Sequence, residues 1–75
     1  MKEIEQFFIK IGKENIDKDS RNLVTNGLID SLDIMKLITE IENFYEKELD
    51  SDFMDIDNFE SFEDIEKMIK KAFNL

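Results

Sequence analysis

Apolar residues recur along this chain at intervals of three and four, and this α-helical period constrains the fold more than any other feature of the sequence. No β-branched run alternates with polar residues over the length of a strand, and no proline interrupts the pattern. We therefore expect an all-α fold, a small bundle of three to four helices. The apolar faces are formed by Ile4, Phe7, Phe8 and Ile11; by Ile34, Leu37, Ile38, Ile41, Phe44 and Tyr45; and by Phe62, Ile65, Met68, Ile69, Ala72 and Phe73.

The segments between these helices differ in character. Residues 15–30 are rich in Asn, Asp, Ser, Thr and Gly with apolar residues scattered among them, which predicts a long first loop that packs on the core. The acidic segment Asp50–Asn58 predicts a second loop with one short helical turn. Ser61, with Asp64 three residues later, predicts the start of the last helix. Because the chain has 75 residues and no linker or repeat, we expect a single domain over residues 1–75.

The chain contains neither cysteine nor histidine, which restricts its chemistry. Without these residues it has no disulfide and no thiolate, and it lacks the most common general base and metal ligand. The aspartates between Asp50 and Asp57 do not fit an EF-hand calcium loop, because Met54 or Phe59 falls where an oxygen ligand is required. We expect no metal site and no enzymatic activity of the chain's own.

The charge is strongly acidic and unevenly distributed. The formal net charge is −9, and the part from Asp30 to Glu66 has 14 acidic residues against Lys36 and Lys47, a local net charge of −12. Such a surface disfavours nucleic acid and anionic membranes, and it favours association with basic patches on other proteins. No apolar run reaches membrane-spanning length and the first residues lack the features of a signal peptide, so we expect a cytoplasmic protein.

The start of the second predicted helix carries the motif Gly27-Leu28-Ile29-Asp30-Ser31-Leu32-Asp33. This stretch resembles the signature of the acyl and peptidyl carrier protein family, in which an Asp-Ser-Leu or Asp-Ser-Ile tripeptide opens a helix of apolar period. The resemblance extends over the whole chain, in its length, acidity, long first loop and short final helix, and Asp57–Phe62 is similar to the family's entry to its last helix. It implies a helical bundle of the acyl-carrier type.

In that family the serine of the tripeptide carries a 4′-phosphopantetheine arm taken from coenzyme A. The resemblance implies that Ser31 is the attachment site, flanked by Asp30 and Leu32, and that the chain carries acyl or aminoacyl groups as thioesters. It also implies that Asp30 and Asp33 serve a phosphopantetheinyl transferase and its metal ion. A helix N-terminus offers N–H groups and a positive dipole end to a phosphate, and the arm supplies the thiol that the chain lacks.

The second predicted helix is also expected to be the docking surface for the transferase and for acyl- or aminoacyl-loading and acyl-using enzymes with basic patches. Leu32 and Met35 lie off the apolar stripe and are candidate apolar contacts. Asp33, Glu40 and Glu42 are candidate charge contacts. A carrier that visits several enzymes is expected to be a monomer.

Lys36 is a further candidate partner contact, at a place where carriers of fatty acid biosynthesis usually have an acidic residue. Ile29 also departs from those carriers, which often have a smaller residue before the Asp-Ser pair. Both departures favour a carrier of specialised or amino-acid-loading biosynthesis over the housekeeping carrier of fatty acid biosynthesis.

Two alternatives remain. Ser31 is a favoured N-cap residue, so its place at a helix start is also explained by capping alone. A small acidic helical adaptor that binds a partner protein without a prosthetic group shares the predicted fold, the charge and the exposed Met35, but it does not need Ser31.

Overall fold

Three α-helices and two short 3-10 helices make up the structure, with no strand, and a computed structural model describes all residues from Met1 to Leu75. The prediction of an all-helical fold is therefore confirmed. The molecule has a radius of gyration of 11.1 Å and measures 28 × 21 × 21 Å. In chain order the elements are α1 (Lys2–Lys10), α2 (Ser31–Tyr45), η1 (Ser51–Phe53), η2 (Ile56–Phe59) and α3 (Phe62–Phe73).

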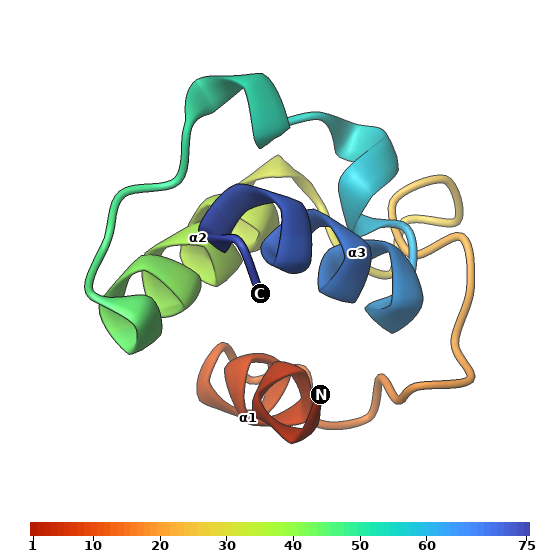
Figure 1. Ribbon diagram of the computed structural model, residues 1–75. Helices are drawn as coiled ribbons and strands as arrows, with labels where there is room; N and C mark the ends of the chain where they lie inside the picture. Colours follow the sequence, from red (N-terminus) through yellow and green to blue (C-terminus); the bar gives the residue numbers. More distant parts are fainter.

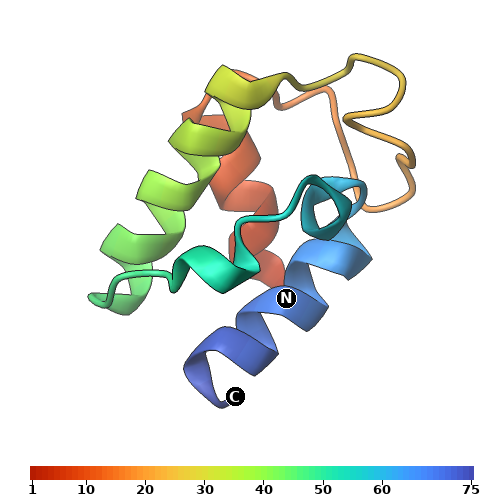
Figure 2. The same ribbon diagram turned by 90° about the horizontal axis from the view of Figure 1, so that it is seen from above.

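The helix α1 packs against both α2 and α3, and η2 packs against α3. In the view of Figure 1, α1 lies below α2 and α3, and the 3-10 segment lies above them. Seen from above, α2 and α3 run in roughly the same direction on either side of α1, and the long first loop closes the end of the molecule where α2 and α3 begin (Figure 2). None of the helices has the length and apolar character needed to cross a membrane.

One hydrophobic core of 16 buried residues lies between the helices. It contains most of the three predicted apolar stripes, and Phe8, Ile41 and Ile69 in these stripes are fully buried. Phe44 is the exception, because it lies at the margin of its stripe and its side chain is 54% exposed. Its ring packs edge-on against Phe7, with ring centroids 5.6 Å apart, instead of entering the core. The assignment of Phe44 to the buried face was therefore wrong.

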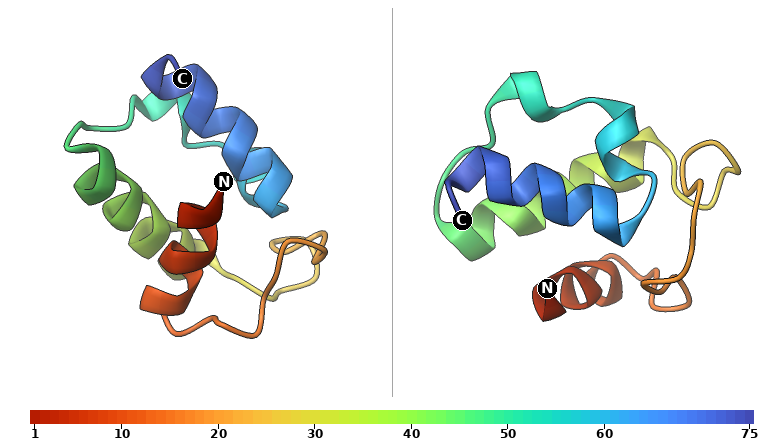
Figure 3. Two further views of the ribbon diagram at one scale, coloured as in Figure 1. Left: turned by 60° about the horizontal axis from the view of Figure 1, so that its bottom comes forward. Right: turned by 45° about the vertical axis from the view of Figure 1, so that its right-hand side comes forward.

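The first loop, between Lys10 and Ser31, is long and packs on the core as predicted. Three of its apolar side chains, those of Ile16, Leu23 and Ile29, are buried. The carbonyl oxygen of Leu23 accepts hydrogen bonds from the N–H groups of Leu28 (2.8 Å) and Ile29 (3.0 Å). These bonds fold the end of the loop into a compact turn that leads directly into α2, visible from two sides in Figure 3.

The segment between α2 and α3 forms two 3-10 helices, whereas the sequence predicted one short helical turn. Asp50 begins η1 by accepting a hydrogen bond from the N–H of Asp52 at 2.9 Å, and Asp55 begins η2 in the same way with Asp57 at 3.0 Å. Aspartate stabilises turns through such bonds to the backbone two residues on, so the repeated spacing gives two turns. At α3 the predicted cap is confirmed, because Ser61 accepts a hydrogen bond from the N–H of Asp64 at 3.1 Å.

Candidate functional site

Ser31 is the first residue of α2, and its side chain is exposed to solvent. The residue that caps the helix is Asp30, whose backbone is extended (φ −115°, ψ −175°). Since the cap position is taken by Asp30, the alternative that Ser31 serves as the N-cap is wrong. The Ser31 hydroxyl makes no hydrogen bond within the protein, so it is free to react or to bind.

Asp30 and Asp33 form a reciprocal capping box around Ser31. The Asp30 carboxylate accepts a hydrogen bond from the N–H of Asp33 at 2.9 Å, and the Asp33 carboxylate accepts one from the N–H of Asp30 at 3.1 Å. Both bonds satisfy N–H groups that a helix start leaves without a partner. The first turn that carries Ser31 is consequently fixed in place by its own sequence neighbours.

The hydrogen bonds of the first turn also set the ionisation of Asp30. The N–H of Asp33 is the main cause that lowers the pKa of Asp30 below its ordinary value, and the positive charge of Lys13 acts weakly in the same direction. Asp30 is therefore an anion at neutral pH and a poor proton acceptor.

Lys13 connects the first loop to the start of α2. Its ammonium group donates a hydrogen bond to the carbonyl oxygen of Leu28 at 3.3 Å and lies 3.6 Å from a carboxylate oxygen of Asp33. This contact partly neutralises the acidic end of the helix. Sequence reasoning did not identify Lys13, because nothing in the local pattern indicates which lysine of the first loop reaches the distant motif.

Exposed apolar side chains lie near Ser31 in the sequence. Leu28 is 42% exposed, and Leu32 and Met35 are each 61% exposed, whereas Ile29 between them is buried. The backbone reaches this arrangement through Gly27, whose φ of 71° lies in the left-handed region that glycine favours. The prediction that Leu32 and Met35 lie off the buried stripe is confirmed.

The acidic side chains predicted to contact partners are all engaged within the protein. The Asp33 side chain is almost completely buried in the capping box. Glu40 lies 3.7 Å from the ammonium of Lys10, and the Glu42 carboxylate accepts a hydrogen bond from the N–H of Leu49 at 2.8 Å.

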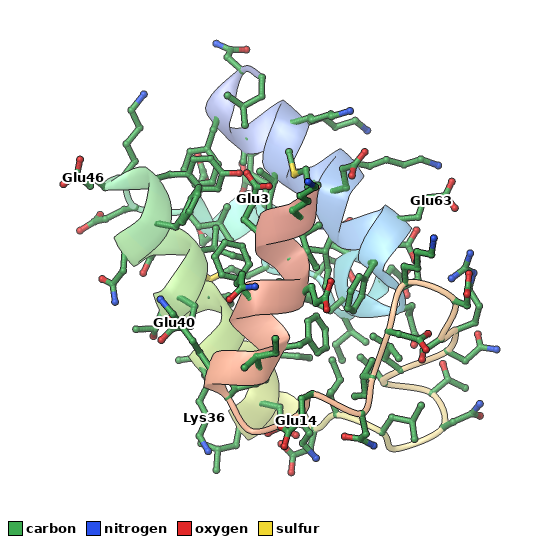
Figure 4. The ribbon with its side chains drawn as sticks, turned by 90° about the horizontal axis from the view of Figure 1, so that it is seen from below. Glu3, Glu14, Lys36, Glu40, Glu46 and Glu63 are labelled. Carbon is green, nitrogen blue, oxygen red and sulfur yellow. The ribbon has the colours of Figure 1, made fainter.

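Lys36 differs from these acidic residues, because it is exposed and no carboxylate lies within 4.0 Å of its ammonium group. Figure 4 shows Lys36 and Glu40 on the side of α2 that adjoins the C-terminal end of α1.

Glu60, between η2 and α3, holds the first loop close to the site. Its carboxylate accepts hydrogen bonds from the N–H groups of Val24 (2.8 Å) and Thr25 (3.1 Å) and from the Thr25 hydroxyl, while its carbonyl oxygen accepts one from Leu23 at 3.0 Å. The Thr25 hydroxyl is the main cause that lowers the pKa of Glu60. Sequence reasoning also missed this contact, which joins residues 35 positions apart.

Ser31 lines neither of the two main hollows on the surface. The larger, of about 600 Å³, lies between α1, the first loop and the start of α3, with Ile4, Ile16 and Phe62 among its lining residues. The smaller, of about 310 Å³, is lined by Lys10, Ile11, Lys36, Thr39 and Glu40. No group of three or more acidic side chains is arranged to hold a metal ion.

No protein-family model, curated protein or solved structure matches this chain.

Proposed function

We propose that the chain is a carrier protein whose Ser31 is modified with 4′-phosphopantetheine. The observation that carries the proposal is the free and exposed hydroxyl of Ser31 on the first turn of a helix that Asp30 caps. A serine that capped the helix would have its oxygen engaged with the backbone. Here the motif that resembles the carrier signature presents its serine to solvent on a rigid element.

The residues around Ser31 suit a phosphodiester at this position. Ser31 and Leu32 are the first two residues of α2, where N–H groups have no partner within the helix and the dipole is positive. The acidic neighbours are restrained, since the Asp33 carboxylate faces the N–H of Asp30 and the ammonium of Lys13. The exposed side chain of Leu32 leaves an apolar surface beside the attachment point.

Modification would join the Ser31 oxygen to the phosphorus of the pantetheine phosphate, with loss of the nucleotide part of coenzyme A. The chain has no histidine, and Asp30 is a weak base because its pKa is lowered, so the transferase must remove the hydroxyl proton. When attached, the arm supplies a terminal thiol that carries an acyl or aminoacyl group as a thioester. The chain itself contributes a fixed attachment point and a surface for partner enzymes.

The same proposal specifies the partners, the pathway and the location that we expect for the chain. The partners are a phosphopantetheinyl transferase and the enzymes that load and use the acyl or aminoacyl group. Lys36 and Ile29 favour a specialised or amino-acid-loading pathway over the housekeeping one. We expect the carrier to act as a monomer in the cytoplasm, without catalytic activity of its own.

The test is the intact mass of the protein after incubation with coenzyme A and a transferase of broad specificity. We expect the wild type to gain one phosphopantetheine group and one titratable thiol per chain. Ser31→Ala should gain neither. Ser51→Ala removes another exposed serine hydroxyl, at the start of η1, and should be modified like the wild type. A folded wild-type chain that gains no mass would contradict the proposal and favour a helical adaptor without a prosthetic group.

A further inference from the structure

The exposed face of α2 that follows Ser31 carries an unpaired cation, whereas Asp30, just before Ser31, is an exposed anion. Leu32, Met35 and Lys36 are spaced at three and four residues and therefore share one exposed face of α2, with Leu28 beside its start. Lys36 is the charged residue of this face that has no ion pair. We call these four residues the α2 surface.

The carboxylates on α2 already have partners within the protein, so they add no free negative charge to the α2 surface. The Asp33 side chain is buried in the capping box beside Lys13, and Glu42 holds the N–H of Leu49. Glu40 pairs with Lys10, and both line the hollow of about 310 Å³ together with Lys36. Two lysines therefore face a single glutamate in that hollow, which leaves an excess of one positive charge.

The acidic residues that dominate the net charge lie elsewhere. The acidic segment from Glu46 to Asp52 follows the C-terminal end of α2, at the opposite end from Ser31, and the chain then returns through η2 toward the first loop (Figure 2). The helix has 15 residues, and its two ends are consequently about 20 Å apart. Since the Debye length is about 8 Å at physiological salt, charges at the C-terminal end of α2 have little effect at its start.

We propose that the α2 surface binds a protein partner whose apolar recess covers Leu32 and Met35 and whose carboxylate side chain enters the hollow beside Lys36. This inference rests on the proposed function, because it identifies the partner of the carrier site, and it replaces the basic patch predicted from the overall charge. Charge complementarity supports it, since a basic group on the partner would meet Lys36 and Lys10 in the hollow, where the carboxylate of Glu40 is already paired.

The test uses the 75-residue chain without its arm and two synthetic amphipathic helical peptides. The peptides have the same apolar face of Leu and Phe, but one is flanked by glutamates and the other by lysines. Binding is mapped by the shifts of the backbone amide resonances and measured at physiological salt. We expect the glutamate-flanked peptide to shift the amides of residues 28–39, and Lys36→Glu to weaken its binding about fivefold. Lys47→Glu makes the same charge change at an exposed lysine beyond α2 and should leave the affinity unchanged.

A loss of binding in Leu32→Ala or Met35→Ala would support the apolar part of the proposal, and circular dichroism would establish that these variants stay folded. The proposal is overturned if the lysine-flanked peptide shifts the same amides as strongly. It is also overturned if Lys36→Glu leaves the affinity for the glutamate-flanked peptide unchanged. Loading of Ser31 is measured separately by intact mass, so failure of this docking mode and failure of the carrier function give different results.

Discussion

Asp30 and Asp33 each accept a hydrogen bond from the backbone N–H of the other, at 2.9 and 3.1 Å, across the first turn of α2. This exchange leaves the hydroxyl of Ser31, which lies between them in sequence, without any role in the structure of the helix. Stability and modification are consequently assigned to different residues of one short motif. The first two predictions test this division.

Asp30→Ala should destabilise the protein, because it removes the acceptor for the N–H of Asp33. Loss of an N-cap typically lowers the melting temperature of a domain of this size by about 4–8 °C. Asp30→Asn keeps an acceptor of nearly equal capping preference and should melt close to the wild type. Thermal unfolding followed by circular dichroism measures both. Equal melting temperatures for Asp30→Ala and the wild type would mean that the cap does not contribute to stability.

Ser31→Ala should leave the stability of the protein almost unchanged. The hydroxyl is exposed and makes no hydrogen bond, so its removal is expected to alter the free energy of unfolding by less than about 0.5 kcal/mol. Urea denaturation of the unmodified protein is the appropriate measurement. A large loss of stability in Ser31→Ala would show that the serine has a structural role and would weaken the case for an attachment site.

The helices were predictable from the sequence because their apolar faces follow the helical period, and because the starts of α2 and α3 also carry capping residues. Ser61 and Asp64 illustrate this, since the spacing of a local hydrogen bond can be read directly from the sequence. The choice of the N-cap between Asp30 and Ser31 was not predictable, because both residue types are favoured there. Only the backbone conformation of Asp30 separates the cap from the first helical residue.

The contacts that hold the first loop were beyond sequence reasoning for a different reason. Lys13 and Glu60 act on residues far from them in the chain, and charge alone does not determine which of many partners an ion will meet. The number of 3-10 turns could not be predicted either, because alternating aspartates favour turns but do not determine how many form. Phe44 shows that a residue at the margin of an apolar stripe is not assigned by period alone.

Leu23→Ala should strongly destabilise the protein, because Leu23 is fully buried although it lies in a loop. Truncation of a buried leucine typically costs about 2–5 kcal/mol of unfolding free energy. Leu28→Ala is a matched control, since Leu28 belongs to the same loop but its side chain is 42% exposed. We expect it to unfold at nearly the same urea concentration as the wild type. Similar small effects of both variants would contradict the conclusion that the loop is anchored in the core.

Thr25→Val should raise the pKa of Glu60 toward its ordinary value, since the Thr25 hydroxyl is the main cause that lowers it. A pKa that is lower in the folded than in the unfolded state stabilises the fold above the unfolded value, which is about 4.3 for glutamate. This stabilisation is lost as the pH falls through the folded value.

The side-chain carboxyl resonance of Glu60, followed by NMR between about pH 6 and pH 2, measures the shift directly. Thr39→Val is the control, because the Thr39 hydroxyl bonds to the carbonyl oxygen of Met35 and not to Glu60. The wild type should also lose more stability on acidification than Glu60→Gln, which cannot titrate at this position. An unchanged pKa of Glu60 in Thr25→Val would contradict the assigned cause.

The melting temperature should rise with salt, because the acidic residues from Glu46 to Asp57 repel one another. Lys47 is the single basic residue in this segment. None of the acidic residues from Glu46 to Asp57 lies within 4.0 Å of a cationic nitrogen. Screening shortens the reach of this repulsion from about 30 Å at 0.01 M salt to about 3 Å at 1 M. Divalent cations should have the same effect at lower concentration, without a specific site.

The variant Glu48→Gln/Asp52→Asn separates this repulsion from general effects of salt on folding. Both side chains are exposed and accept no hydrogen bond from the backbone, whereas the carboxylates of Asp50 and Asp55 cap their turns. The variant should melt at a higher temperature than the wild type at low salt, and the difference should diminish as salt is added. Melting temperatures measured at fixed pH over a series of sodium chloride concentrations test this. If the variant and the wild type responded equally to salt, the repulsion would have to lie elsewhere in the chain.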